Sequence, residues 1–438
     1  MSSLYTTFKQ QLRAMPSTRF VLAFSGGVDS RVLLDLLARY QREHHCECLA
    51  VHVHHGLSPN ADDWAQRCQY WGEQTGIPVV TEYADIQRES GMSLEQVARE
   101  ARYALLAKHV QAETCLLLGQ HADDQLETFL LAMKRGSGPK GLAAMAKCDR
   151  FADGQRLRPL LTHRRSEIEA YATQHHLQWV SDESNQDERF DRNFLRHQIT
   201  PNLIARWPNI HASIQRSAEL CAEQEDVMAS LLKDKLKSLL HEDKSLAIQA
   251  LCDESAAVRH QLFRHWLNRL GVAMPSRRHT QMIWDEVAQA DQDANPLLNL
   301  GEHHIRRFQG RLYCVPHHDD ISQWQHVLHC DCPLHLPNHL GTLSLQTGSG
   351  DGLAMTLPKG YEPSRLRVSF DPSGREAKPE GRAGRRKLKK LYQEMGIPSW
   401  HRRQYPIILY DEQVVAVAGL FVSQAFSGQE YTLKWQRD

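Results

Sequence analysis

A chain of 438 residues is too long for one compact hydrophobic core and suggests two or three domains. Its 41% hydrophobic and 24% charged content is typical of a globular protein, and no apolar run is long enough to cross a bilayer, which excludes a membrane-spanning protein. Lys plus Arg and Asp plus Glu each number 52, which excludes the strongly basic composition of a simple nucleic-acid coat.

The first twenty residues mix polar and charged side chains and lack the apolar block of an export signal. Ten cysteines are scattered along the chain without any Cys-x-x-Cys pair, which gives little support to a disulfide framework, a zinc finger or a cluster site. We therefore expect a cytoplasmic protein with reduced thiols and no membrane association. No obligate protein partner is evident from the sequence.

The first half of the chain alternates short apolar runs with amphipathic segments, a pattern that favours a parallel sheet flanked by helices. Buried strands are predicted at 19–24, 47–53 and 114–119. Apolar residues recur at helical spacing after Ser30 and again after His121, so two helices should begin at the carboxyl ends of strands. The predicted fold of 1–210 is α/β, a doubly wound, Rossmann-like parallel sheet.

Between the first strand and its helix stands a loop rich in glycine and hydroxyl groups. It consists of Ser25, Gly26, Gly27, Val28, Asp29 and Ser30. Adjacent glycines let the backbone turn tightly and present N–H groups to an anion, and the helix N-terminus adds partial positive charge. We expect a polyphosphate here, with Asp29 placed to hold Mg²⁺ or to orient a reactant. The Lys of a Walker loop is absent, so γ-phosphoryl transfer is not implied.

A second polar segment, 119–128, follows the third predicted strand and opens a helix. His121 and Asp124 share one helical face, and Glu127 lies one turn from Asp124. Acidic residues at a helix N-terminus are also favoured by the helix dipole, so each one alone could be structural. Together they predict a carboxylate-rich cleft.

The second half of the chain changes character. The stretch 211–292 is almost wholly helical in pattern, and 304–315 predicts a hairpin that turns at Gly310. Beyond 330, short strand-like pieces surround a basic helical segment at 385–395. We expect a mainly helical domain over 211–320 and a small mixed α/β domain over 321–438.

The glycine loop resembles the SGGxDS loop of the N-type ATP pyrophosphatases, the PP-loop family, which transfer adenylyl groups at the α-phosphate of ATP. The chain further resembles the tRNA(Ile)-lysidine synthases in segments spread over nearly 200 residues. These are VHVHHGL at 51–57, ARxxRY at 98–103, HADDQLET at 121–128, RGSGPKGLAAM at 135–145, RPLL at 158–161, and DESN with RNFLRH within 182–197.

The resemblance implies roles for particular residues. The loop Ser25–Ser30 would bind ATP, with Asp29 also near the reacting centre. The carboxylates of Asp124 and Glu127 would receive the ammonium group of a lysine substrate. The further residues that the resemblance implicates are Asn185 and Arg196 as lysine ligands, Arg102 or Arg99 as a stabiliser of charge, and His121 or a carboxylate as proton acceptor.

Contacts to tRNA are expected at the mouth of the site and in the last domain, where the basic run with an interleaved Tyr392 suits an RNA backbone. The same run could be an ordinary solvated helix face. The residues assigned to tRNA are Arg192, Arg385, Arg386, Lys387, Lys389, Lys390, Arg402 and Arg403.

In the reaction that the resemblance implies, the carbon-2 oxygen of the wobble cytidine in a CAU anticodon attacks the α-phosphate of ATP, and pyrophosphate leaves. The ε-amine of lysine then attacks carbon-2 and AMP departs, giving lysidine. The partners implied are isoleucine tRNA, L-lysine and Mg-ATP. Three rivals stay open: a PP-loop tRNA thiolase, an NAD or GMP synthetase, and a non-catalytic RNA-binding module.

Overall fold

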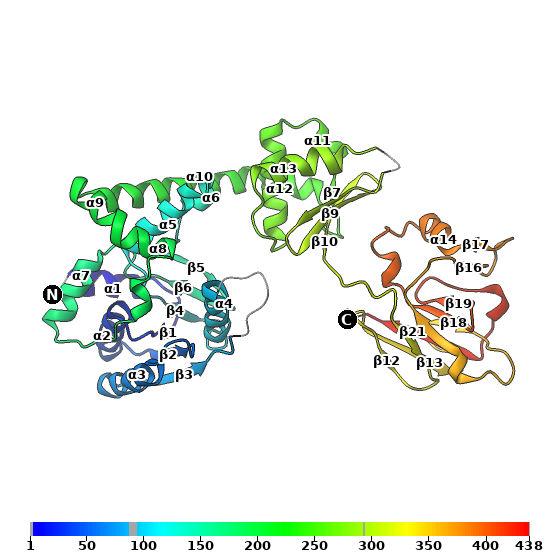
Figure 1. Cartoon of the computed structure of the whole chain (residues 1–438), viewed down its shortest axis with the longest axis horizontal. Coiled ribbons are helices and arrows are strands. Elements are labelled where there is room, and N and C mark those ends of the chain that lie inside the picture. The colour runs from blue at the N-terminus through cyan, green and yellow to red at the C-terminus, as the bar shows by residue number, and fades with distance from the viewer. Residues whose placement is uncertain (1–2, 87–93, 292–293, 438) are drawn as a thin grey trace. The chain divides into compact units, whose positions relative to one another are not determined.

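The computed structural model describes residues 3–86, 94–291 and 294–437. The chain divides into two compact units, Met1–Leu231 and Leu232–Asp438 (Figure 1). Among the described residues, no helix has the length and apolar character needed to cross a membrane. The boundary between the units falls inside one long helix, α10 (Ile210–Leu239), and the three domains expected from the sequence stay a prediction.

The first unit is built on a sheet of six strands. In order across the sheet these are β3 (Val79–Tyr83), β2 (Glu47–His54), β1 (Arg19–Ala23), β4 (Thr114–Leu117), β6 (Gly154–Leu157) and β5 (Cys148–Phe151). All neighbouring pairs are parallel except the last, β5 with β6. The predicted α/β class and the three predicted strands are therefore confirmed.

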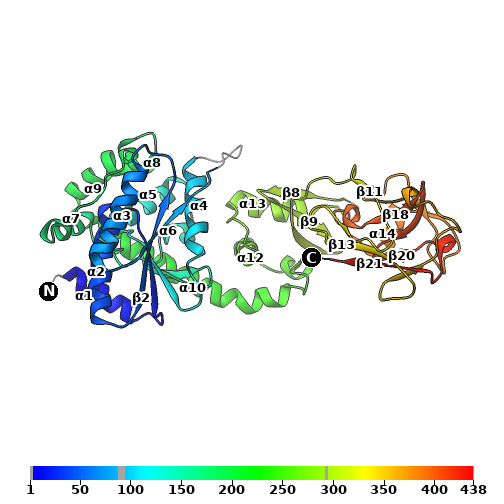
Figure 2. The same cartoon turned by 90° about the horizontal axis from the view of Figure 1, so that it is seen from below.

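Helices cover both faces of this sheet, as the alternation of side chains along its strands requires. On β1, Phe20 and Leu22 pack into a core with α1 (Ser3–Arg13), α2 (Val28–Glu43), α3 (Ala61–Thr75) and α7 (Arg165–Gln174). Val21 points the other way, into a smaller core with Leu106 of α4 (Leu94–Ala107). Figure 2 shows α4 on the opposite side of the sheet from α2 and α3.

Strands β1 and β4 are direct neighbours, so the loops that follow them meet at one edge of the sheet. The first loop leads into α2, and the second leads into α5 (Ala122–Lys134). A Cβ on Gly119 would lie only 3.2 Å from Asp29 Cβ and 3.3 Å from Ser30 N, which shows how closely the two loops approach. The remainder of the unit contains short helices at α6 (Pro139–Leu142), η1 (Glu183–Gln186), α8 (Asp191–Phe194), η2 (Leu195–Ile199) and α9 (Thr200–Arg206).

The middle of the chain contains α10, α11 (Gln249–Cys252), α12 (Ala256–Arg269), α13 (Arg277–Met282) and η3 (Ile283–Ala288). Beside these helices lies an antiparallel sheet in the order β7 (Leu246–Ala247), β10 (Arg311–Pro316), β9 (His303–Phe308) and β8 (Leu297–Leu300). The hairpin predicted at 304–315 is confirmed as β9 and β10, and its turn residues Gln309 and Gly310 both have positive φ, at 45° and 73°.

The last part of the chain is rich in strands. One sheet has the order β11 (Gln325–Val327), β15 (Leu366–Ser369), β18 (Ile407–Tyr410), β19 (Gln413–Val417), β20 (Phe421–Val422). A second has the order β12 (Leu334–His335), β13 (Thr342–Thr347), β21 (Tyr431–Gln436), β14 (Leu353–Met355). The short strands β16 (Glu376–Ala377) and β17 (Arg386–Lys387) form a separate pair.

The predicted helix at 385–395 needs correction at its start. Helix α14 covers only Leu388–Glu394, because Arg386 and Lys387 are extended and pair with β16. Leu388, Leu391 and Tyr392 anchor this helix in a buried apolar cluster.

Candidate active site

The loop after β1 turns at Gly26, whose φ of 85° lies in the region that favours glycine. A Cβ at this position would also lie 3.0 Å from both Cys68 Sγ and Val180 Cγ2. Gly27 has an ordinary φ of −68°, and a Cβ there would meet only Ser25 Oγ, at 3.6 Å. The turn therefore requires Gly26, whereas Gly27 keeps the start of α2 uncovered.

The start of α2 offers unpaired N–H groups to an anion. The first backbone bond of the helix runs from Arg31 N–H to Gly27 O, at 2.9 Å. The N–H groups of 28–30 precede it and have no acceptor within the helix. Together with the helix dipole they favour bound phosphate. The side chain of Val28 is buried, so its backbone is the part that can take part.

Two hydroxyl groups shape the same loop. Ser30 Oγ donates to Gly27 O at 3.0 Å and accepts from Gly26 N–H at 3.1 Å, and it lies 3.1 Å from Ser25 Oγ. Ser30 is buried, whereas Ser25 is exposed. Of the two predicted hydroxyl donors, Ser25 is the one placed to reach a phosphate, and Ser30 holds the loop in shape.

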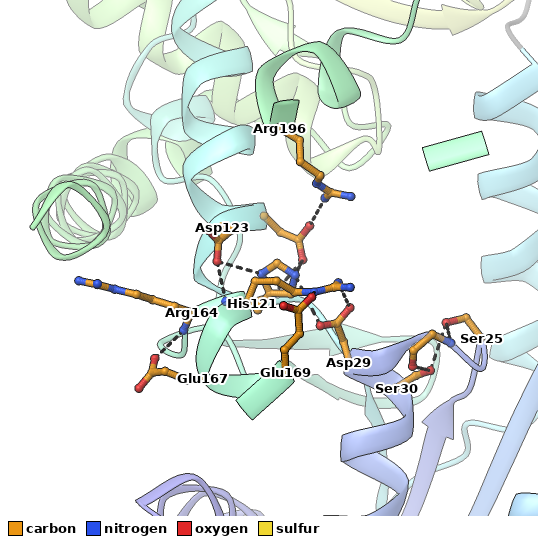
Figure 3. A network of polar contacts seen from close by, with 12 residues as sticks. Ser25, Asp29, Ser30, His121, Asp123, Arg164, Glu167, Glu169 and Arg196 are labelled. Carbon is orange, nitrogen blue, oxygen red and sulfur yellow. Dashed lines mark hydrogen bonds and ion pairs between the residues drawn. The ribbon is translucent and has the colours of Figure 1, made fainter. Parts of the chain in front are cut away.

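Asp29 lies at the point where the two loops meet. Its Oδ2 accepts a 2.7 Å bond from Arg165 Nη1, and its Oδ1 lies 3.7 Å from His121 Nε2 (Figure 3). Burial raises the pKa of Asp29 above its usual range, although the positive charges of His121 and Arg165 oppose this. Oδ1 is buried without a hydrogen-bond partner among the described residues, so it has acceptor capacity left.

A magnesium ion fits this arrangement only if both the protein and the nucleotide supply its ligands. Among the described residues, no three His, Cys, Asp or Glu side chains gather closely enough to hold a metal by themselves. Magnesium is commonly held by one or two carboxylates together with substrate phosphates. The free Oδ1 of Asp29 beside the phosphate loop matches that requirement.

His121 caps α5 and is almost fully buried, with carboxylates on several sides. Its Nδ1 lies 3.5 Å from Asp123 Oδ2, and its Nε2 lies 3.4 Å from Asp124 Oδ2 in addition to Asp29 (Figure 3). Burial acts to lower the pKa of His121, but the hydrogen bond to Asp123 and the charges of Asp124 and Asp29 raise it overall. A ring with a raised pKa favours the imidazolium, which suits contact with phosphate better than proton removal.

Asp123 is part of the site although it was not selected from the sequence. It accepts bonds from His211 Nε2 at 3.0 Å and from Arg165 N–H at 2.8 Å. Burial acts to raise the pKa of Asp123, but the hydrogen bonds from His121 and His211 lower it well below its usual range. Asp123 therefore joins α5, α7 and the start of α10 and orients His121.

The two carboxylates that were predicted to bind an ammonium group, Asp124 and Glu127, lie close together and both accept hydrogen bonds from the guanidinium group of Arg196. Arg196 Nε donates to Glu127 Oε1 at 2.8 Å, and its Nη2 donates to Glu127 Oε2 at 3.0 Å and to Asp124 Oδ1 at 3.1 Å. Burial raises the pKa of Glu127, opposed by Arg196. The structure thus brings together three of the predicted lysine ligands, Asp124, Glu127 and Arg196. The guanidinium group of Arg196 points at the two acids, so it is not free to bind the carboxylate of a lysine substrate in this arrangement.

Two neighbours of this cluster were also predicted. Arg192 donates from Nη2 to Thr128 Oγ1 at 2.9 Å, and its Nε lies 3.4 Å from Glu127 Oε2. Asn185 is exposed on η1, where its carbonyl oxygen lies 2.9 Å from His197 Nε2. Arg192 contacts the acid cluster, whereas the main-chain oxygen of Asn185 contacts His197, the residue after Arg196.

The choice between Arg99 and Arg102 was left open by the sequence. Both guanidinium groups lie over the ring of Tyr103, at 5.1 and 5.3 Å. Arg102 is half-buried and Arg99 is exposed. Burial, followed by the positive charge of Arg102, lowers the pKa of His55, and burial, with smaller contributions from the charges of Arg99 and Arg192, lowers the pKa of Arg102. Arg102 is thus the more buried of the two arginines and the one whose charge acts on His55.

The basic run of the last domain is mostly exposed. Exposed side chains are found at Arg385, Arg386, Lys387, Lys389, Lys390 and Arg403, whereas Arg402 is half-buried. Arg386 pairs with Glu394, and Arg403 with Asp320, at 3.3 Å. Tyr392 is fully buried, and burial raises its pKa, so this interleaved ring is not available to RNA.

Three family models match consecutive parts of the chain. They are a PP-loop domain over residues 2–203, a TilS substrate binding domain over 246–313, and a TilS substrate C-terminal domain over 366–437.

Relatives similar along the whole length are named tRNA(Ile)-lysidine synthase. The protein of Vibrio cholerae is 55% identical, covering 99% of this chain and 98% of its own, and that of Vibrio parahaemolyticus is 52% identical over the full length of both. That of Photobacterium profundum is 49% identical, with 99% of each chain covered. A U34-tRNA thiolase, NcsA from Methanococcus maripaludis, aligns over 50% of this chain and 78% of its own with 20% identity and a TM-score of 0.42.

Proposed function

The chain belongs to the tRNA(Ile)-lysidine synthase family, and from this membership we propose how its site carries out the reaction. The enzyme is a carbon–nitrogen ligase that uses ATP to join L-lysine to carbon-2 of the wobble cytidine of isoleucine tRNA with a CAU anticodon. An adenylated cytidine is the intermediate, and AMP and pyrophosphate are released. The observation that carries this function is the meeting of the phosphate loop and the carboxylate-rich helix at Asp29, His121 and Asp124.

The phosphate loop binds ATP through the N–H groups at the start of α2 and the hydroxyl of Ser25. Asp29, with its unused Oδ1, would hold Mg²⁺ together with the phosphates. When bound, Mg²⁺ supplies positive charge that offsets the repulsion between the phosphates and an attacking oxygen. His121, whose pKa is raised, contributes a second positive charge beside Asp29, and Arg102 a third from α4.

The lysine ammonium binds at Asp124 and Glu127. These two side chains already receive a cation, the guanidinium of Arg196, with distances of 2.8 to 3.1 Å. Since Arg192 also lies 3.4 Å from Glu127, the two negative charges are balanced by two guanidinium groups, and an ammonium group can replace one of them. In this proposal Arg196 shares or leaves the pair when lysine arrives, and its fork then meets the lysine carboxylate, with Asn185 as a further ligand.

Attack on carbon-2 requires the lysine ε-amine in its neutral form, so one proton must leave it. His121 is a poor acceptor because its surroundings favour the protonated ring. Glu127 is better suited, since burial raises its pKa and a carboxylate of raised pKa accepts a proton more readily. Of the candidate proton acceptors that the sequence left open, we therefore propose that Glu127 accepts the proton of the lysine ε-amine.

The tRNA binds through the mouth of this site and through the second unit, with its target cytidine turned out of the stack. Arg192 and the exposed cations of 385–403 are the proposed backbone contacts. The cytoplasmic location expected from the sequence stays a prediction. Full-length similarity to lysidine synthases favours this function over the thiolase, the NAD or GMP synthetase and the non-catalytic module.

The test is incubation of the full-length protein with ATP, radiolabelled lysine and unmodified isoleucine tRNA. Label should enter the tRNA with one pyrophosphate released per lysine joined, and Asp29→Ala should abolish both. Pyrophosphate release that does not depend on tRNA, or none with all substrates present, would contradict the proposal.

A further inference from the structure

Two phenylalanine side chains at the two ends of α8 are exposed to solvent, since Phe190 precedes the helix as its N-cap residue and Phe194 is its last residue. Phe190 is 42% exposed and Phe194 is 44% exposed. Phe194 N–H donates to Phe190 O at 3.0 Å, so the backbones of the two residues are held one turn apart. A single exposed apolar residue needs no explanation, but two large exposed rings one turn apart form a patch suited to a partner.

The same short segment carries the arginines of the acid cluster. Arg192 lies between the two rings in sequence and reaches Thr128 of α5, and Arg196 follows on η2 and reaches Glu127. The segment is fixed in place by buried Asn193, whose Nδ2 donates to Asp187 O at 2.9 Å. At its start, Asp191 is paired with Lys134 of α5 at 2.7 Å. The rings are therefore presented from a fixed support next to the proposed lysine site.

We propose that Phe190 and Phe194 are a stacking platform for the unpaired anticodon bases next to the target cytidine. This inference rests on the proposed function, which requires a single-stranded loop at this site. A phenylalanine ring has no hydrogen-bonding group, and it stacks on the face of any base. Arg192 is about one-third exposed, at 33% of its side chain, and supplies positive charge for an adjoining phosphate. Aromatic rings beside arginines suit single-stranded RNA better than a purely apolar protein partner.

The experiment compares two stem–loop RNAs on the full-length enzyme by fluorescence anisotropy. One carries the intact CAU loop, and the other has an abasic residue in place of the central adenosine. Replacing both rings, Phe190→Leu with Phe194→Leu, keeps the apolar character and removes stacking. We expect the intact loop to bind at least about tenfold more weakly and the abasic loop to bind as before. Phe190→Trp and Phe194→Trp should keep the affinity of the wild type.

A matched control is Tyr70→Leu, which changes another exposed ring, 56% accessible, on α3. It should leave binding of both RNAs unchanged. Equal binding of the intact loop by the leucine variant and the wild type overturns the platform, as does an equal loss for both RNAs. A change of oligomeric state in the leucine variant without a change in RNA binding would assign the patch to a second copy of the chain. Lysidine formation by the wild type in the same preparation separates failure of the platform from failure of the proposed function.

Discussion

Replacing Arg196 by alanine should destabilise the first unit, because it leaves the buried carboxylate of Glu127 with a weaker partner. Glu127 is 1% exposed and receives two short bonds from Arg196, at 2.8 and 3.0 Å. Removing one member of a buried ion pair costs about 3–5 kcal/mol. Arg192 stays within 3.4 Å of Glu127, and Arg196 is itself 32% exposed, so we expect a smaller loss, of about 2 kcal/mol.

The measurement is equilibrium unfolding in urea, with Arg189→Ala as the matched control. Arg189 lies on the same segment and pairs with Asp187 at 2.6 Å, but 88% of its side chain is exposed, so its loss should not change the unfolding midpoint. A double-mutant cycle with Glu127→Gln should give a coupling energy above ~1 kcal/mol. Equal effects of the two arginine variants, or additivity in the cycle, would refute the ion pair as a stabilising contact.

Three further outcomes follow from the site. Gly26→Ala should destabilise the protein by about 1–3 kcal/mol in thermal or urea unfolding, because Gly26 has a positive φ and close neighbours. Gly27→Ala should leave the stability unchanged and weaken ATP binding. Equal losses of stability in the two variants would contradict this difference. The pKa of Asp123 is lowered by folding, so Asp123→Asn should destabilise by about 1–2 kcal/mol at every pH above roughly 4. That difference should shrink as the pH falls below the unfolded pKa toward the folded one; a difference that grows in acid would contradict it. Replacing Lys389 and Lys390 by Gln should reduce the slope of log affinity for tRNA against log salt by about 0.7–0.9 per lysine, and an unchanged slope would remove them from the interface.

The strands of the first unit could be predicted because parallel strands buried on both faces are nearly continuous apolar runs. The runs at 19–24 and 47–53 became β1 and β2 within one residue. The start of α14 could not be predicted in the same way. Arg386 and Lys387 favour helix by propensity, but pairing with Glu376 and Ala377 holds them in a strand, and this contact is not visible in local sequence.

In the candidate site, too, local features could be predicted from the sequence, whereas contacts between distant residues could not. The loop at 25–30 and the segment at 119–128 could both be placed at strand ends, and the adjacency of β1 and β4 brings them together. Asp123 was missed because its partners Arg165 and His211 are 42 and 88 residues away along the chain. The burial of Tyr392 could not be predicted either, because a tyrosine in a basic run looks exposed, whereas the helix turns this ring into the core.

The most direct test of the chemistry follows the carbon-2 oxygen of the target cytidine. Isoleucine tRNA carrying oxygen-18 at that position would be incubated with the enzyme, ATP and lysine, and the products would be analysed by mass spectrometry. Adenylation of the cytidine predicts that the isotope leaves in AMP, one atom for each lysidine formed, with none in pyrophosphate. Isotope that stays in the RNA, or that leaves by any route other than AMP, would contradict an adenylated cytidine.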